Sequence, residues 1–207
     1  MLLFDLDGVL VNNSTIGRYI EARSVRFLQR YPKIGKNAYS INKRAYKTLG
    51  HTSLALGNSP QHVMEYNDFV FNQDTLNFVR NSLTNDDLLH INKVGGITRN
   101  LGMPVGLCTN TPLRYCESVL FSGVFTDQLL SNAFTSDTGL IKPNDEFYDA
   151  CETDVSMPLY FLDDSMINID AVRDRENWYP LHVIGTADLC EKLSRFEQGE
   201  VPMWEQH

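Results

Sequence analysis

The sequence contains few cysteines, and none of them are arranged as in a typical metal or redox site. Its 207 residues include four, at positions 108, 116, 151 and 190, and no two form a CxxC pair. Scattered cysteines of this kind are typical of reduced thiols in the cytoplasm. We therefore expect neither a disulfide framework nor a thiolate metal site.

Long apolar runs and a targeting segment are also missing. No apolar run approaches the roughly 18 residues that a membrane-spanning helix needs. Met1 leads directly into a strand-like run, without the basic and apolar regions of a signal peptide. These two absences predict a cytoplasmic protein with no membrane partner.

Basic residues are outnumbered by acidic ones. Eighteen Lys and Arg residues against twenty-six Asp and Glu residues give a net charge of −8. This balance argues against binding of a nucleic-acid polymer, although a metal ion or a few placed cations could still hold a small anion. The length indicates one domain, or one core with a modest insertion. We expect a monomer or a homodimer, although nothing in the sequence distinguishes the two.

Four short apolar runs have the character of buried parallel strands. They cover residues 2–4, 105–108, 159–162 and 181–184, and a weaker candidate covers 128–130. Helical patterns lie over 84–101, 112–121, 144–152, 166–176 and 186–196. Strands that alternate with helices predict an α/β fold with a Rossmann-like, doubly wound parallel sheet.

The alternation is interrupted between residues 13 and 82. This stretch shows helix-like apolar stripes and no convincing strand. A crossover between parallel strands needs only a dozen or more residues, so about 70 residues are too many for a simple crossover. We expect a small all-helical cap at 13–82 on a core formed by 1–12 and 83–207.

Polar residues follow the predicted strands, at the edge of the sheet where α/β proteins bind ligands. They are Asp5, Asp7, Gly8, Thr109, Asn110, Lys142, Asp163, Asp164, Ser165 and Asn168. Four carboxylates at one edge would repel one another unless a cation held them, and oxygen ligands suit Mg²⁺. The sequence therefore predicts a magnesium site at this edge.

The same residues form four motifs in order: DxDG at 5–8, an apolar run ending in TN at 105–110, GxxKP at 139–143 and DDSxxN at 163–168. Together they resemble the haloacid dehalogenase superfamily of phosphohydrolases over essentially the whole chain. The helical stretch after the first motif matches the position of that family's helical cap. Asp7 favours phosphoryl transfer, because dehalogenases of the superfamily generally lack aspartate at this position.

The resemblance implies a role for each catalytic residue. Asp5 would attack phosphorus and form an aspartyl-phosphate, while Asp7 would act first as general acid and then as general base. Thr109, through its hydroxyl, and Asn110, through its backbone amide, would hold the phosphoryl oxygens. Lys142 would balance the charge between Asp5 and the phosphoryl group.

The resemblance also implies a ligand set for Mg²⁺. The ion would be held by Asp5, by the backbone carbonyl of Asp7 and by Asp164. Asp163 would contribute directly or from behind these ligands. Asn168 would orient the acidic loop, with Gly8 and Ser165 in supporting positions.

A finer resemblance concerns the substrate, a small phosphorylated metabolite. The segment from Tyr46 to Leu54, with 68–70, is similar to the cap of pyrimidine 5'-nucleotidase-like members, which implies His51 and Thr52 as specificity residues and a nucleoside 5'-monophosphate as substrate. The chain departs from those members at Gly8, where they often carry a bulkier residue, and at 176–178, where a glycine-bearing segment is usual. A phosphosugar phosphatase, a phosphomutase and a non-catalytic binding or regulatory protein remain alternatives.

Overall fold

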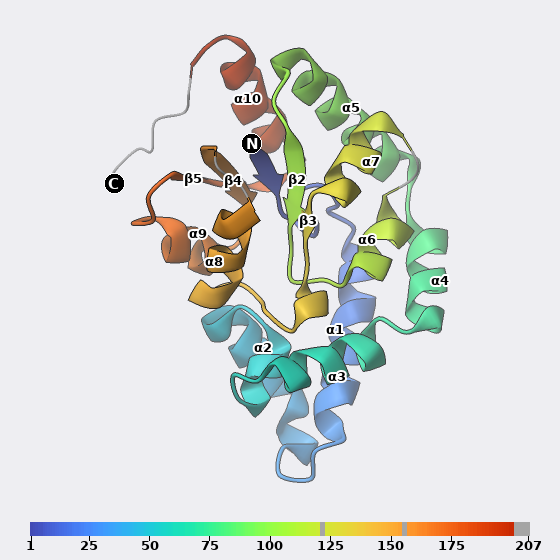
Figure 1. Cartoon of the computed structure of the whole chain (residues 1–207). Coiled ribbons are helices and arrows are strands. Elements are labelled where there is room, and N and C mark those ends of the chain that lie inside the picture. The colour runs from blue at the N-terminus through green and yellow to red at the C-terminus, as the bar shows by residue number, and fades with distance from the viewer. Residues whose placement is uncertain (121–122, 155–156, 201–207) are drawn as a thin grey trace.

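The centre of the protein is a five-stranded sheet in which every pair of neighbouring strands is parallel (Figure 1). The structure is a computed structural model that describes residues 1–120, 123–154 and 157–200. The strands are β1 (Leu2–Phe4), β2 (Val105–Cys108), β3 (Ala133–Phe134), β4 (Leu159–Asp163) and β5 (Trp178–His182). Their order, β3-β2-β1-β4-β5, is that of a doubly wound sheet and confirms the predicted α/β class.

Ten α-helices surround the sheet within the described residues. Four of them follow β1: α1 (Ser14–Gln29), α2 (Ala38–Leu49), α3 (Pro60–Val70) and α4 (Gln73–Ser82). The others are α5 (Asn85–Leu101), α6 (Leu113–Val119), α7 (Val124–Ser131), α8 (Asp145–Asp154), α9 (Met166–Val172) and α10 (Gly185–Glu197). Short 3-10 turns lie at Gly35–Asn37, Thr52–Leu56 and Ser136–Thr138.

Both faces of the sheet are covered, which explains why the strands read as unbroken apolar runs. Leu2 and Phe4 of β1 belong to a large apolar cluster with side chains of α5, α6, α7 and α10. Leu3 points the other way and packs in a second cluster with α8 and α9. No helix in the described part of the chain is long and apolar enough to cross a membrane.

The predicted start and end of α5 are confirmed. The Thr84 hydroxyl accepts a hydrogen bond from the Asp87 backbone, and the Asp87 carboxylate accepts one from the Thr84 backbone, which is a capping box. Gly102 ends the helix in the left-handed conformation, at a φ of 63°.

Two strand predictions are wrong in position. Residues 128–130 lie in α7, and the adjacent strand is the two-residue β3. The last strand begins at Trp178 and ends at His182, so it starts three residues before the predicted run 181–184. Pro180 hid this strand from sequence reasoning, and it is tolerated because β5 is an edge strand with a free N–H side.

Two predicted helices are shorter than expected. The one at 166–176 ends at Val172, and the one at 112–121 ends at Val119, with residue 121 outside the described residues. The prediction that 13–82 holds no strand is confirmed, since its regular elements are helices throughout.

Helices α1 to α3 lie beyond the carboxyl ends of the strands, and α4 lies beside α6 (Figure 1). They are joined to the rest of the molecule by polar contacts: Asn67 of α3 donates to the Ser136 hydroxyl at 2.9 Å, and Asp68 forms an ion pair with Arg114 at 3.0 Å. Apolar side chains of α1, α3 and α4 also belong to the large cluster that covers the sheet. The four helices therefore form a helical layer packed against the core, with α1 to α3 over one end of the sheet.

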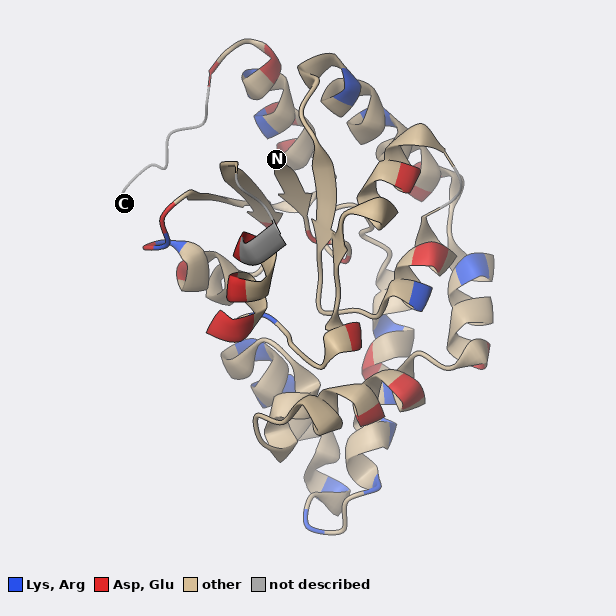
Figure 2. Ribbon diagram, viewed as in Figure 1, with Lys and Arg blue, Asp and Glu red and all other residues tan. Residues whose placement is uncertain are grey.

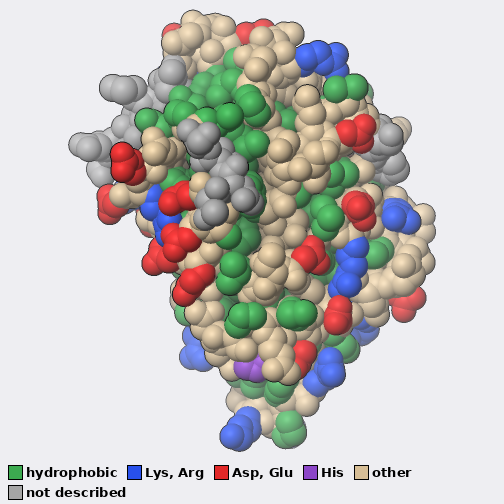
Figure 3. All heavy atoms as spheres, in the orientation of Figure 1, with side chains coloured by type: hydrophobic (Ala, Val, Ile, Leu, Met, Phe, Trp, Pro, Cys, Tyr) green, Lys and Arg blue, Asp and Glu red, His purple; other side chains and the backbone are tan. Residues whose placement is uncertain are grey.

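Charged residues are unevenly spread over the surface. Figure 2 shows acidic positions along α8 and basic positions along α2. The space-filling view shows acidic side chains gathered over α8 (Figure 3). Arg175 pairs with Asp145, Asp149 and Glu152 of this helix at 2.8 to 2.9 Å.

Candidate active site

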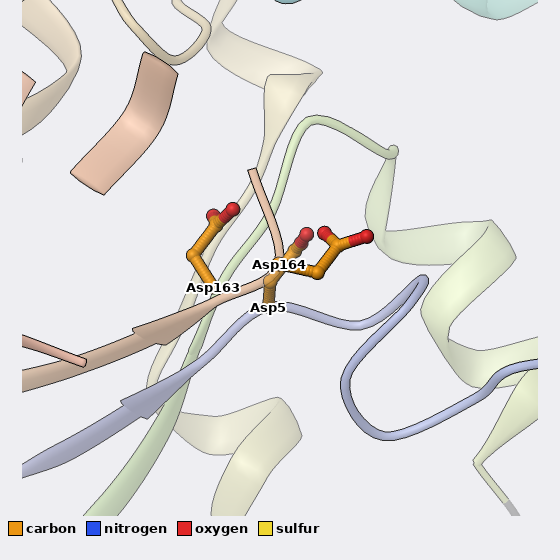
Figure 4. Close-up of side chains that lie close together, drawn as sticks. All are labelled: Asp5, Asp163 and Asp164. Atoms are coloured by element: carbon orange, nitrogen blue, oxygen red, sulfur yellow. The ribbon is translucent and has the colours of Figure 1, made fainter. Parts of the chain in front are cut away.

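The central strands β1 and β4 bring the first and last motifs together. Phe4 is paired with Leu162, and the backbone N–H of Asp5 donates to the Leu162 carbonyl at 2.9 Å. Connections leave β1 and β4 toward opposite halves of the sheet, and such a switch point is where doubly wound proteins bind ligands. The side chains of Asp5, Asp163 and Asp164 consequently rise on the same side of the strand ends (Figure 4), with carboxylate oxygens within 4.8 Å of one another.

A cavity of about 570 Å³ lies between these strand ends and helices α1 and α2. Every site residue predicted from the sequence lines it except Asp163, and so do His51 and Thr52. The structure thus brings the four motifs to one cavity, although they are spread over more than 160 positions of the sequence.

Lys142 is the central cation of the site. It is only 1% exposed, and its Nζ lies 3.1 Å from Asp5 Oδ1, 2.6 Å from Asp163 Oδ2 and 2.6 Å from the Cys108 carbonyl. Burial alone would lower the pKa of Lys142, but the carboxylates of Asp163 and Asp5 outweigh it and hold that pKa well above its usual value. The ammonium therefore stays charged between the two carboxylates.

Asp163 is a buried acceptor behind the site. Its Oδ1 accepts from the Ser165 backbone at 2.8 Å and from Asn168 Nδ2 at 3.1 Å, while its Oδ2 accepts from Lys142 and Asn168. Both oxygens are thus already bonded to protein donors. This arrangement suits a carboxylate that fixes Lys142 and the acidic loop. Of the two roles predicted for Asp163, it favours support from behind the metal ligands over direct binding of the ion.

Only one of the two carboxylate oxygens of Asp5 has a partner among the residues that the structure describes. Its Oδ1 accepts from the Leu6 backbone at 2.8 Å and faces Lys142, whereas its Oδ2 has no partner in the described part of the chain. Burial raises the pKa of Asp5 to about 8, against the effect of Lys142, and the carboxylates of Asp163, Asp164 and Asp7 add to the rise. A further cation at this position would hold Asp5 as an anion at neutral pH.

Asp164 lies over Gly8, which leaves the space that its carboxylate fills. Gly8 has a φ of 87°, and a Cβ at this position would lie 2.2 Å from Asp164 Oδ2. Desolvation raises the pKa of Asp164 to about 6, and the charge of Asp163 adds to the rise. Asp5 and Asp164 therefore offer oxygens for a hard divalent cation, and the donor set fits Mg²⁺.

Asp7 lies one turn beyond Asp5, where the backbone has left the strand. The backbone turns here, since Gly8 N–H donates to the Val11 carbonyl at 2.7 Å. Asp7 Oδ1 accepts from the hydroxyl of Tyr115 at 2.8 Å. Burial raises the pKa of Asp7 to about 6, and the hydrogen bond from Tyr115 works against this rise.

Thr109 and Asn110 lie where β2 ends. The Asn110 side chain donates to the Lys142 carbonyl at 2.9 Å and accepts from the Lys142 N–H at 2.7 Å, so it clamps the lysine loop. The Thr109 hydroxyl lies 3.1 Å from that of Thr111. The side chain of Asn110 thus has a structural role that the sequence did not predict, in addition to the predicted role of its backbone.

His51 and Thr52 lie at the cavity wall with little exposed surface, 6% and 3%. Thr52 donates to Asn42 at 2.8 Å, and His51 Nδ1 lies 2.8 Å from the Ser53 hydroxyl. Burial lowers the pKa of His51 to about 4, so its ring is neutral at physiological pH. Both side chains therefore take part in the internal hydrogen bonds of the helical layer.

Two tyrosines also line this cavity. Tyr46 lies in the segment that the resemblance to a nucleotidase cap singled out, although it was not named as a specificity residue, and Tyr115 was not predicted from the sequence. Tyr46 of α2 is 65% exposed and lines the cavity, as do Lys43 and Lys47 on the same side of the helix. Tyr115 lies in the first turn of α6 and is fully buried. The helical spacing of 43, 46, 47 and 50 is a signal that could have indicated a shared face, whereas the contact of Tyr115 with Asp7 joins residues 108 positions apart.

No model of a known protein family matches the chain, and no curated protein matches it.

Proposed function

We propose that the protein is a Mg²⁺-dependent phosphohydrolase that cleaves a small phosphomonoester through an aspartyl-phosphate. In this proposal, the sheet and helices α5 to α10 form a core of the haloacid dehalogenase type, and α1 to α4 form its cap. The observation that carries it is the setting of Asp5: it lines the cavity with Asp164, its Oδ1 faces the buried ammonium of Lys142, and its Oδ2 has no partner among the described residues.

The first step uses Asp5 and Asp7. Asp5 Oδ2 would attack phosphorus, and the bond between phosphorus and the leaving oxygen would break as protonated Asp7 gives that oxygen its proton. Lys142 would offset the charge shared by Asp5 and the phosphoryl group. The Thr109 hydroxyl and the Asn110 backbone N–H would hold the phosphoryl oxygens.

The second step restores the enzyme. Asp7, now a carboxylate, would take a proton from water, which attacks phosphorus and releases Asp5 and inorganic phosphate. Asp5, Asp164 and the Asp7 carbonyl would hold Mg²⁺, whose charge lets an anionic carboxylate approach an anionic phosphate.

The cavity supports a small substrate. A volume of about 570 Å³ under a packed helical layer suits a metabolite better than a polymer. The exposed ring of Tyr46 offers a flat apolar surface to a planar leaving group, which supports a nucleoside 5'-monophosphate. A sugar phosphate would use the same core residues, as a substrate for hydrolysis or for internal phosphoryl transfer.

Phosphate release from a panel of phosphomonoesters, with and without Mg²⁺, tests the proposal. The panel contains an aryl phosphate, one purine and one pyrimidine 5'-monophosphate, and one hexose phosphate. We expect Mg²⁺-dependent release that is lost in Asp5→Asn. Conversion of the hexose phosphate to an isomer without release would indicate the mutase, and binding of phosphomonoesters without turnover would indicate the non-catalytic alternative.

A further inference from the structure

We propose that Tyr115 is a positioning residue that fixes the carboxyl group of Asp7 relative to the leaving oxygen, and that Phe71 keeps Tyr115 in place. The inference rests on the proposed function, because it takes Asp7 as the general acid and base. It adds a residue outside the four motifs and a route by which the helical layer acts on the chemistry.

The hydrogen bond from Tyr115 gives the two carboxyl oxygens of Asp7 different surroundings. The Tyr115 hydroxyl donates to Asp7 Oδ1 at 2.8 Å, and Tyr115 has no exposed surface. Asp7 Oδ2 has no hydrogen-bond partner among residues 1–120, 123–154 and 157–200, and Asp7 lines the cavity. One oxygen is therefore fixed by the protein, and the other is left for the substrate.

The ring of Tyr115 packs against a residue of the helical layer. The ring of Phe71, which ends α3, lies 5.0 Å from the ring of Tyr115 at an angle of 58°. Phe71 is only 2% exposed, and α3 is fastened to the turn at Ser136 by two hydrogen bonds from Asn67. Because Tyr115, Phe71 and Asn67 are all buried, the hydroxyl of Tyr115 has little freedom to leave Asp7.

The chemistry gives this contact a specific signature. In the first step, the proton on Asp7 Oδ2 moves to the ester oxygen as its bond to phosphorus breaks, and Tyr115 keeps its own proton. An alkoxide leaves poorly without that proton, whereas a nitrophenolate leaves readily. If Asp7 is no longer held in position, kcat/KM should therefore fall for alkyl phosphates and change little for aryl phosphates.

The test compares kcat/KM of wild type and Tyr115→Phe on 4-nitrophenyl phosphate and on an alkyl phosphomonoester that the wild type cleaves. Tyr115→Phe keeps the ring that packs on Phe71 and removes the hydroxyl alone. We expect kcat/KM for the alkyl ester to fall about 10- to 100-fold, and for the aryl ester to fall less than about 3-fold.

Tyr148→Phe is the matched control. Tyr148 is equally buried, and its hydroxyl donates to the backbone carbonyl of Asn168 at 3.3 Å, away from Asp7. Whatever this change does to stability, the ratio of alkyl to aryl kcat/KM should stay at the wild-type value.

Equal losses on both esters in Tyr115→Phe would overturn the positioning role while leaving the proposed function intact. If Tyr115→Phe does not fold, Phe71→Leu serves instead, and it should lower the same ratio by a smaller factor; an unchanged ratio in that variant would also overturn the inference. Absence of release from every phosphomonoester by the wild type would overturn the proposed function, and this inference with it.

Discussion

Asp5 and Asp163 face the same buried ammonium, yet their surroundings differ. Asp163 accepts hydrogen bonds on both oxygens from Ser165, Asn168 and Lys142, while Asp5 keeps Oδ2 without a partner in the described part of the chain. A carboxylate that is fully bonded supports its neighbours, and one with a free oxygen can react. In the proposed reaction, this difference between the two residues favours Asp5 over Asp163 as the group that attacks phosphorus.

Replacement of Asp5 by Asn should therefore abolish turnover and spare the fold. Asn has nearly the same size and can still accept from the Leu6 backbone, but it lacks the charge that attack requires. We expect phosphate release below about a hundredth of wild type. The melting temperature with Mg²⁺ left out should stay at the wild-type value or rise, because a crowded carboxylate has been removed. A well-folded Asp5→Asn protein with higher activity would exclude Asp5 as the nucleophile.

At this scale the sequence predicted which residues meet, because each motif follows a strand and parallel strands end at one edge. It did not predict which hydrogen-bond partners each of these residues has. The donors around Asp163 come from a turn and a helix whose exact geometry has no sequence signature. Asp7 meets Tyr115 only through the tertiary packing that places α6 near the turn after β1.

Helix α2 lies next to both the cavity and the loop that carries Lys142. Its cavity-facing side carries Lys43, Tyr46 and Lys47, and it ends at Gly50. Helix periodicity predicted α2, but the face it turns to the core depended on the layer packing of α1 to α4. The choice of His51 and Thr52 for specificity came from the resemblance of the segment starting at Tyr46 to a nucleotidase cap, and that resemblance did not single out Tyr46 itself.

Tyr46→Ala should change the order of preferred substrates. The exposed ring lines the cavity, so its removal should lower kcat/KM for nucleoside monophosphates relative to the hexose phosphate, by about 10-fold at most for one lost stacking contact. Tyr39→Ala is the matched control, since Tyr39 lies on the same helix, is 57% exposed and does not line the cavity. An equal change for every substrate in Tyr46→Ala would contradict a role in recognition.

Gly50→Ala should disturb the site from a distance. Gly50 ends α2 at a φ of 80°, and a Cβ there would lie 2.9 Å from Pro143, next to Lys142. The added methyl group must push α2 away from the lysine loop, so we expect a lower melting temperature together with lower kcat/KM. Gly35→Ala is the control, because Gly35 also has a positive φ, 42°, with nothing within 4 Å of its Cβ position. That variant should lose stability without losing activity; equal behaviour of the two would contradict a steric effect on the loop.

For the whole molecule, the chain order of strands and helices predicted the doubly wound sheet, and the helical stretch 13–82 predicted a separate layer. The two edge strands were misplaced because β3 has two residues and β5 contains Pro180, so neither has the apolar pattern of a central strand. The central strands β1, β2 and β4 were found at their correct positions, and they are the ones that carry the site.

The stability of the whole protein should depend on pH and Mg²⁺ together. Without metal, the pKa values of Asp5, Asp7 and Asp164 in the folded protein are about 8, 6 and 6, above the ordinary value of 3.8. The folded state therefore binds these protons more tightly than the unfolded state. Their contribution to the free energy of unfolding is fully present below about pH 4 and is lost as pH rises through 6 and then 8.

Mg²⁺ competes with those protons for the same oxygens, so it should stabilise the protein more when they have been lost. We expect the rise in melting temperature on adding Mg²⁺ to be larger at pH 8 than at pH 5. Comparing samples with Mg²⁺ and with chelator at one pH cancels the contribution of the other titrating groups. Asp5→Asn should reduce the difference between the two pH values, because it removes the carboxylate with the highest pKa. An equal Mg²⁺ effect at both pH values would contradict binding at this carboxylate cluster, even if Mg²⁺ still raised the melting temperature, because a cation held elsewhere on the surface would not compete with these protons.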